Sequence, residues 1–261
     1  MERVEHSRGG SPVDSPERSR AHHSRPAAEV TGIGVGFDFD HTLGIDNKLE
    51  RVAFLRLLEF LLGEGGRALG TLAEESARID ALLALQRSGA FPIDEAVGRF
   101  VRERAPASNV AQCVERYKSM AVHSVGDFVI PMPGARELFD TLASRGIPSA
   151  ILTNGWDPLQ KKKAERIGFI GPVVVSETIG AQKPSRRAFD MLSEALGRPD
   201  AIWYVGDNPA TDVVASIGAG MNGVWFDAEQ AGYPSGVSKP TATIHALADL
   251  PALFPGALTQ A

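Results

Sequence analysis

Two aspartates one residue apart, Asp38 and Asp40, follow a short apolar run near the start of this 261-residue chain. A carboxylate can attack an electrophile, bind a divalent cation or transfer a proton, so the two side chains could divide these tasks. Other polar residues follow later apolar runs or precede an expected helix: Thr153, Asn154, Lys183 and Asp207. Displacement at an anionic phosphorus centre needs such a set of acids, an ammonium group and hydrogen-bond donors.

The segments around these residues predict a parallel sheet. Short apolar runs rich in β-branched residues predict buried strands at 31–38, 148–152, 173–175, 201–205 and 223–226. Helical segments alternate with the later strands, and we interpret Asp157 and Asn208, each followed by proline, as N-caps of two of these helices. Alternation of this kind implies parallel strands with helices on both faces and a ligand site beyond their carboxyl ends. The expected fold class is α/β, with a Rossmann-like parallel sheet core and an inserted all-helical cap domain.

The insertion is predicted from four stretches of apolar residues at helical spacing between residues 47 and about 125. In the first stretch, Val52, Leu55, Leu58 and Leu62 share one helical face. We therefore expect three parts in the chain: a disordered tail at 1–29, an α/β core at 30–43 and 133–261, and a helical cap at 44–132. The tail is rich in Ser, Arg and Pro and has almost no large apolar residue to bury.

The overall composition limits the partners and the cellular location that we expect for this protein. The formal net charge of −5 argues against nucleic acid or an anionic membrane as the main partner. The single Cys113 cannot form an intramolecular disulfide, and no apolar run approaches the length of a membrane span. We expect a soluble, cytoplasmic protein.

Four segments, in this order along the chain, resemble the motifs of the haloacid dehalogenase-like hydrolase superfamily: Asp38-Phe-Asp-His-Thr42, Ile151-Leu-Thr-Asn154, Gln182-Lys-Pro184 and Gly206-Asp-Asn-Pro-Ala-Thr-Asp212. The resemblance covers about residues 33–250. It is strongest to the phosphatase branch with an inserted helical cap, which holds phosphoglycolate phosphatases, N-acylneuraminate phosphatases and pyrimidine nucleotidases. A closing cap would exclude water and restrict access, so we expect a small phosphorylated metabolite as the substrate.

The polar side chains of these motifs can each be given a role in phosphate ester hydrolysis. Asp38 would attack phosphorus and form an aspartyl-phosphate, and Asp40 would protonate the leaving group and then activate water. Lys183 would bind phosphate and keep Asp38 ionised, while the Thr153 hydroxyl and the Asn154 backbone N–H would donate to phosphate oxygens. Mg²⁺ would be bound by the carboxylates of Asp38 and Asp207, with the backbone carbonyl of Asp40 as a further ligand that the resemblance implies.

Neighbouring residues receive supporting roles. Asp212 would hold Lys183 or a metal-bound water, or would be a solvated carboxylate in the second turn of its helix. Asn208 would contact the metal shell through water unless its role as an N-cap already accounts for it. Lys161, Lys162 and Lys163 are interpreted as a solvated helix face.

Three alternatives to a phosphatase stay open at this point. A sugar phosphomutase or other phosphotransferase would use the same residues, and a non-catalytic binding protein could share the fold. A 2-haloacid dehalogenase is disfavoured, because members that cleave carbon–halogen bonds typically have no acid at the position of Asp40. The sequence leaves the substrate and the oligomeric state undetermined.

Overall fold

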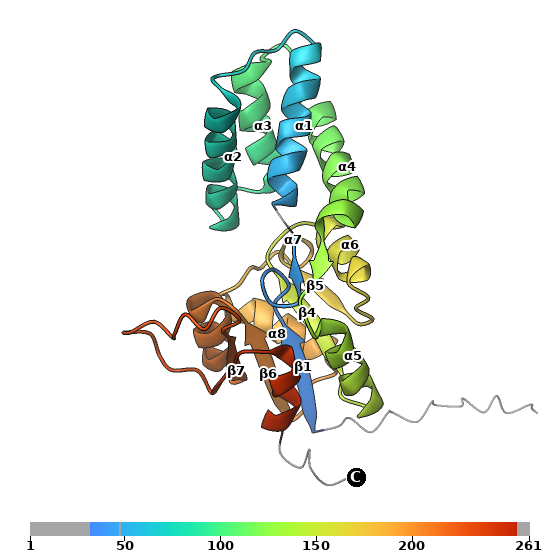
Figure 1. Ribbon diagram of the computed structural model, residues 1–261, viewed down its shortest axis with the longest axis vertical. Coiled ribbons are helices and arrows are strands. Elements are labelled where there is room, and N and C mark those ends of the chain that lie inside the picture. The colour runs from blue at the N-terminus through green and yellow to red at the C-terminus, as the bar shows by residue number, and fades with distance from the viewer. Residues whose placement is uncertain (1–31, 47, 255–261) are drawn as a thin grey trace, which may run out of the picture.

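The computed structural model describes residues 32–46 and 48–254, and within these residues six parallel strands form one sheet (Figure 1). The strands lie in the order β5, β4, β1, β6, β7 and β8 across the sheet. Their bounds are β1 (Ile33–Phe37), β4 (Ser149–Thr153), β5 (Val173–Val175), β6 (Ala201–Gly206), β7 (Asn222–Phe226) and β8 (Ala242–Ile244). The five predicted strands are confirmed with small shifts at their ends. The edge strand β8 was missed because its sequence, Ala-Thr-Ile, is not an uninterrupted β-branched apolar run, in contrast to the equally short β5.

Helices cover both faces of the sheet, which confirms the α/β fold class. Val35 and Phe37 of β1 belong to one apolar cluster with residues of α5 (Ala135–Ser144) and the 3₁₀-helix η2 (Leu247–Leu253). Leu152 and Tyr204 belong to a second cluster with α8 (Arg186–Ala195). The core also contains α6 (Leu159–Arg166), α7 (Ser176–Ile179), the π-helix η1 (Pro209–Val214) and α9 (Ala215–Gly218). The predicted disordered tail at 1–29 lies outside the described residues.

Glycine at position 36 allows α8 to pack closely against β1. A Cβ atom there would lie 2.5 Å from Leu192 Cδ2 and 2.8 Å from Tyr204 Cδ2, well inside van der Waals contact. The alternation of glycine with Val35 and Phe37 therefore gives β1 one bulky and one flat face. The flat face brings α8, and the loop before it that carries Lys183, close to the end of β1.

The insertion contains four helices within the described residues, and four were predicted. They are α1 (Leu49–Gly63), α2 (Leu72–Arg87), α3 (Ile93–Arg104) and α4 (Val110–Phe128), and they stand beyond the carboxyl ends of the strands (Figure 1). The face predicted for α1 is buried only in part: Leu58 is 6% exposed and Leu62 is 45% exposed, whereas Phe54 and Leu57, outside that face, are fully buried. Because α1 packs against α2, α3 and α4, its buried face is wider than one stripe and is turned relative to the prediction. No helix among residues 32–46 and 48–254 has the length and apolar character needed to cross a bilayer.

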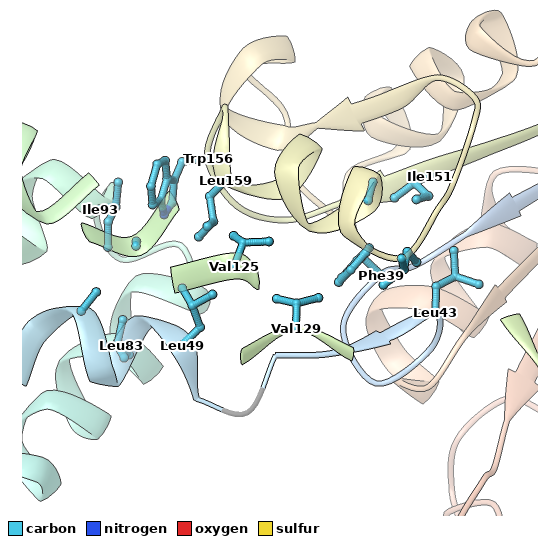
Figure 2. Close-up of a cluster of buried hydrophobic side chains, with 14 of the residues drawn as sticks. Phe39, Leu43, Leu49, Leu83, Ile93, Val125, Val129, Ile151, Trp156 and Leu159 are labelled. Atoms are coloured by element: carbon cyan, nitrogen blue, oxygen red, sulfur yellow. The ribbon is translucent and has the colours of Figure 1, made fainter. Parts of the chain in front are cut away.

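A short ribbon joins the insertion to the core. β2 (Gly44–Ile45) and β3 (Ile130–Pro131) pair antiparallel, so the predicted all-helical segment 44–132 also contains these two strands. One apolar cluster continues through this junction, and Figure 2 shows Val125 and Val129 between the helices of the insertion and Phe39 of the core. The insertion and the core therefore share a continuous apolar contact beside Asp38 and Asp40.

Candidate active site

Asp38 lies at the end of the strand on either side of which the later strands of the sheet are added. β1 pairs with β4 on one side and with β6 on the other, and Asp38 follows β1 directly. Thr153 ends β4 and Asp207 follows β6, so three predicted site residues lie at adjacent strand ends. In open α/β sheets, ligands bind at this kind of switch point.

Lys183 lies at the centre of the site and is only 4% exposed. Its Nζ donates to Asp38 Oδ1 at 2.6 Å, to Asp212 Oδ1 at 2.7 Å and to the hydroxyl of Tyr204 at 3.1 Å. Burial lowers the pKa of Lys183, but the carboxylates of Asp212 and Asp38 outweigh this effect and hold it well above its ordinary value. Each of the three N–H donors of the ammonium group therefore has an acceptor, and the Lys183 side chain stays charged.

Asn154 holds the backbone of Lys183 in place. Its Oδ1 accepts a hydrogen bond from the Lys183 N–H at 2.8 Å, and its Nδ2 donates to the Lys183 carbonyl at 3.0 Å. The neighbouring Thr153 is 1% exposed, and its hydroxyl lies 3.5 Å from the Asn154 carbonyl. The sequence suggested only a role for the Asn154 backbone, so this side-chain contact to the Lys183 loop was missed.

An acidic cluster surrounds the ammonium group. Asp38, Asp207 and Asp212 each offer a carboxylate oxygen, and these oxygens lie within 4.8 Å of one another. Burial, followed by repulsion from Asp38 and Asp212, raises the pKa of Asp207 to about 7. The cluster therefore holds more negative charge than Lys183 balances, and its all-oxygen donor set is suited to a hard divalent cation such as Mg²⁺. The residues present thus fit the expected metal, and Asp212 lies beside the two predicted carboxylates while its oxygens accept from Lys183 and Asn208.

The Asp40 carboxylate forms a separate ion pair with Lys163 of α6. Lys163 is 1% exposed, and its Nζ also lies 3.3 Å from Asp46 Oδ2. The interpretation of Lys161, Lys162 and Lys163 as one solvated face was therefore wrong for Lys163. Adjacent residues of a helix point about 100° apart, so three in a row cannot all face solvent equally.

Two predicted helix caps have different outcomes. Asn208 Oδ1 accepts hydrogen bonds from the N–H groups of Ala210 and Thr211, both at 3.0 Å, which confirms its role as an N-cap. Asp157 does not cap α6: its carboxylate binds Lys161 and the hydroxyl of Thr178, and the helix begins only at residue 159. Asp212 Oδ2 accepts from the backbone N–H of Asn208 at 3.0 Å, so the start of η1 also orients the carboxylate that holds Lys183.

Comparison with known proteins decides the family. A family model described as haloacid dehalogenase-like hydrolase matches residues 34–220, which is most of the chain. The chain belongs to this family. The resemblance to the haloacid dehalogenase-like hydrolase superfamily is therefore confirmed.

Several curated relatives of this hydrolase are phosphatases or nucleotidases. The chain is 31% identical to pyrimidine 5'-nucleotidase YjjG of Escherichia coli over 51% of its own length and 60% of that protein. It is 36% identical to a phosphoserine phosphatase of Thermus thermophilus over 36% of its length and 40% of that protein. The chain thus spans 60% or less of these relatives. The solved structure of the hydrolase YfnB from Bacillus subtilis aligns with 84% of this chain and 96% of its own at a TM-score of 0.61, and at 22% identity this likeness shows the fold alone.

A cavity of about 710 Å³ lies between the sheet and the helical insertion of the hydrolase, and it contains Asp38, Asp40, Thr153, Lys183 and Asp207. The insertion supplies further lining residues, which the sequence did not single out: Glu50, Gln86, Arg87, Ala90, Phe91 and Ile93. Glu50 joins insertion and core, because its carboxylate accepts from the Trp156 indole N–H at 3.2 Å. The predicted site residues and the helices of the insertion therefore line one cavity.

Proposed function

We propose that this hydrolase is a phosphatase that cleaves a small phosphorylated metabolite through an aspartyl-phosphate on Asp38. The observation that carries the proposal is the position of Asp38, whose carboxylate is held by the buried ammonium group of Lys183 in a cavity that Asp40 also lines. A carboxylate that attacks phosphorus needs a fixed cation beside it, since the phosphate is itself anionic. A halide leaves without a proton, so the acid at position 40 favours a phosphate ester over a carbon–halogen bond.

The proposed reaction has two displacements. An oxygen of Asp38 attacks phosphorus, the bond from phosphorus to the leaving oxygen breaks, and the carboxyl of Asp40 gives its proton to the leaving alkoxide. Water then attacks the phosphorus of the aspartyl-phosphate and loses a proton to Asp40, which releases inorganic phosphate and restores Asp38. Lys183, the Thr153 hydroxyl and the Asn154 backbone N–H would stabilise the charge on the phosphoryl oxygens in both steps.

Mg²⁺ would be held by the carboxylates of Asp38 and Asp207 and by the backbone carbonyl of Asp40. It would supply positive charge that reduces the repulsion between Asp38 and the phosphate. Asp212 and Asn208 would support this arrangement, Asp212 by orienting Lys183 and Asn208 by orienting Asp212. The closeness of the Asp38 and Asp207 carboxylate oxygens, which lie within 4.8 Å of each other, supports a bound cation.

The helical insertion at 44–132 would act as the cap of this enzyme, above a core formed by residues 30–43 and 133–261. The cavity of about 710 Å³ is lined by side chains from both parts, and its size suits a metabolite better than a folded phosphoprotein. A nucleoside monophosphate, a phosphorylated amino acid and a phosphorylated hydroxy acid are the first candidates, because curated relatives include a nucleotidase and phosphatases for phosphoserine and phosphoglycolate.

Removal of divalent metal tests the proposal directly. We expect the purified protein to release inorganic phosphate from at least one small phosphomonoester, to lose this activity in EDTA and to regain it when Mg²⁺ is restored. The measurement is phosphate release across a panel of nucleotides, sugar phosphates and phosphorylated acids. Isomerised substrate without free phosphate would indicate a phosphotransferase, and release of halide from a haloacid without any phosphatase activity would contradict the proposal.

Substitution of Asn154 tests the clamp on the Lys183 loop. Asn154→Ala removes both hydrogen bonds to the Lys183 backbone, so we expect kcat to fall by about 100-fold through misplacement of the ammonium group. Asn154→Asp keeps the acceptor and loses the donor, and its kcat should lie between that of Asn154→Ala and the wild type. Equal kcat values in all three proteins would show that the loop holds Lys183 without this side chain.

A further inference from the structure

Lys163 lies outside the four motifs, yet its side chain is among the most buried charged groups of the described residues. It is 1% exposed, its ammonium group binds Asp40 Oδ1, and it lies 3.3 Å from Asp46 Oδ2. The same Nζ lies 4.9 Å from the centre of the Phe39 ring, close enough for a cation–π contact. A buried lysine with two carboxylates and an aromatic face is fixed in place, in contrast to Lys162, which pairs with Glu165 at the surface.

We propose that Lys163 is a positioning residue for Asp40, which it holds in the orientation that acid and base catalysis require. The inference rests on the proposed function, in which Asp40 exchanges a proton with the leaving group and with water. The side chain of Asp40 is 36% exposed in a wide cavity, so without a partner it could rotate away from the reacting atoms. A proton donor must lie within hydrogen-bond reach of the atom that it protonates.

The contact suits both protonation states of Asp40. Lys163 binds one oxygen, Oδ1, and that oxygen can accept a hydrogen bond whether the group is a carboxylate or a neutral carboxyl. The proton can then be carried on Oδ2.

Asp46 fixes the ammonium group from a second side. It follows β2 directly and precedes α1, and its Oδ1 accepts from the backbone N–H of Lys48 at 3.1 Å. The pair between Lys163 and Asp46 therefore joins helix α6 of the core to the first residues of the insertion. Lys163 is thus anchored independently of Asp40, as a positioning group must be.

Leaving-group dependence separates positioning from a merely structural role. p-Nitrophenolate leaves without a proton, so formation of the aspartyl-phosphate from p-nitrophenyl phosphate does not need Asp40, whereas its hydrolysis does. In Lys163→Met we expect a rapid burst of one p-nitrophenolate per enzyme followed by a steady rate reduced by about 100-fold. With an alkyl phosphate, for which both steps need Asp40, we expect kcat to fall about as far, with no burst and no rise in KM.

Stopped-flow absorbance measures the burst of p-nitrophenolate, and two further variants serve as controls. Asp40→Asn should show the same burst, while Lys162→Met, one residue away on the exposed side of α6, should behave as the wild type. If Lys163→Met unfolds because Asp40 and Asp46 repel each other, the double variant Lys163→Met/Asp46→Asn relieves the repulsion and should still show the burst.

Wild-type turnover of alkyl phosphates by Lys163→Met would overturn the inference. Equal loss of the burst and of the steady rate in both the single and the double variant would also overturn it, since only a structural role predicts that result. A wild-type enzyme that releases phosphate from no monoester would instead refute the proposed function. The failures of the two proposals are therefore distinguishable.

Discussion

Asp38→Asn should abolish phosphate release while leaving the fold intact. Asparagine is nearly isosteric and can still accept a hydrogen bond from Lys183, but its amide cannot form an acyl-phosphate by attack on phosphorus. Removal of a nucleophile from an assembled site typically lowers kcat by about 10⁴- to 10⁶-fold. We therefore expect turnover close to the uncatalysed background, with a melting temperature similar to that of the wild type.

Phosphate release and intact-protein mass after rapid acid quench check this prediction. The wild type should carry one phosphoryl group during turnover, and Asp38→Asn should carry none. Asp200→Asn is the matched control, because Asp200 is exposed and lies before β6, at the opposite edge of the sheet. Substantial turnover by Asp38→Asn would show that another residue is the nucleophile and would contradict the assignment of Asp38.

Lys183→Met should lose both activity and stability. The ammonium group is the cation between Asp38 and Asp212, and both side chains are largely buried. Breaking a buried ion pair by removing one partner typically costs about 3–5 kcal/mol, which lowers the melting temperature of a domain of this size by on the order of 10 °C. Turnover should fall by at least about 10³-fold, since the phosphoryl charge loses its fixed cation.

The double variant Lys183→Met/Asp212→Asn separates these two effects. Asparagine at position 212 removes one unpaired carboxylate, so thermal unfolding should recover part of the lost stability while turnover stays absent. Recovery of turnover together with stability would mean that Lys183 serves only to hold the fold. A near-normal rate in the single variant would mean that the cation is supplied elsewhere.

Most residues of the candidate active site could be expected from the sequence because they lie at the ends of regular elements. Asp38, Thr153 and Asp207 each end or follow a buried strand, and parallel strands align their carboxyl ends at one edge. Asn208 next to proline gave a local signal for its capping role, which does not depend on distant residues. Predictions of this kind depend on periodicity and on chain-local hydrogen bonds.

Residues with distant partners could not be predicted in the same way. Lys163 and Asp40 are 123 positions apart, and Glu50 and Trp156 are 106 positions apart. In a run of three lysines, burial of one follows from how α6 packs against the β1 loop and α4, which composition does not show. Its spacing from the buried Leu159 and Gln160 was the available signal, since residues three and four apart share a helical face.

By itself the sequence determined the class of fold, the order of its strands along the chain and the motif residues that could carry phosphate chemistry. The tertiary structure alone decided which of these groups pair. Lys183 binds Asp38 and Asp212, Lys163 binds Asp40, and Asn154 holds the loop of Lys183. The physical reason is that propensity and hydrophobic pattern act over a few residues, whereas ion pairs and cavities depend on the packing of elements far apart in the chain.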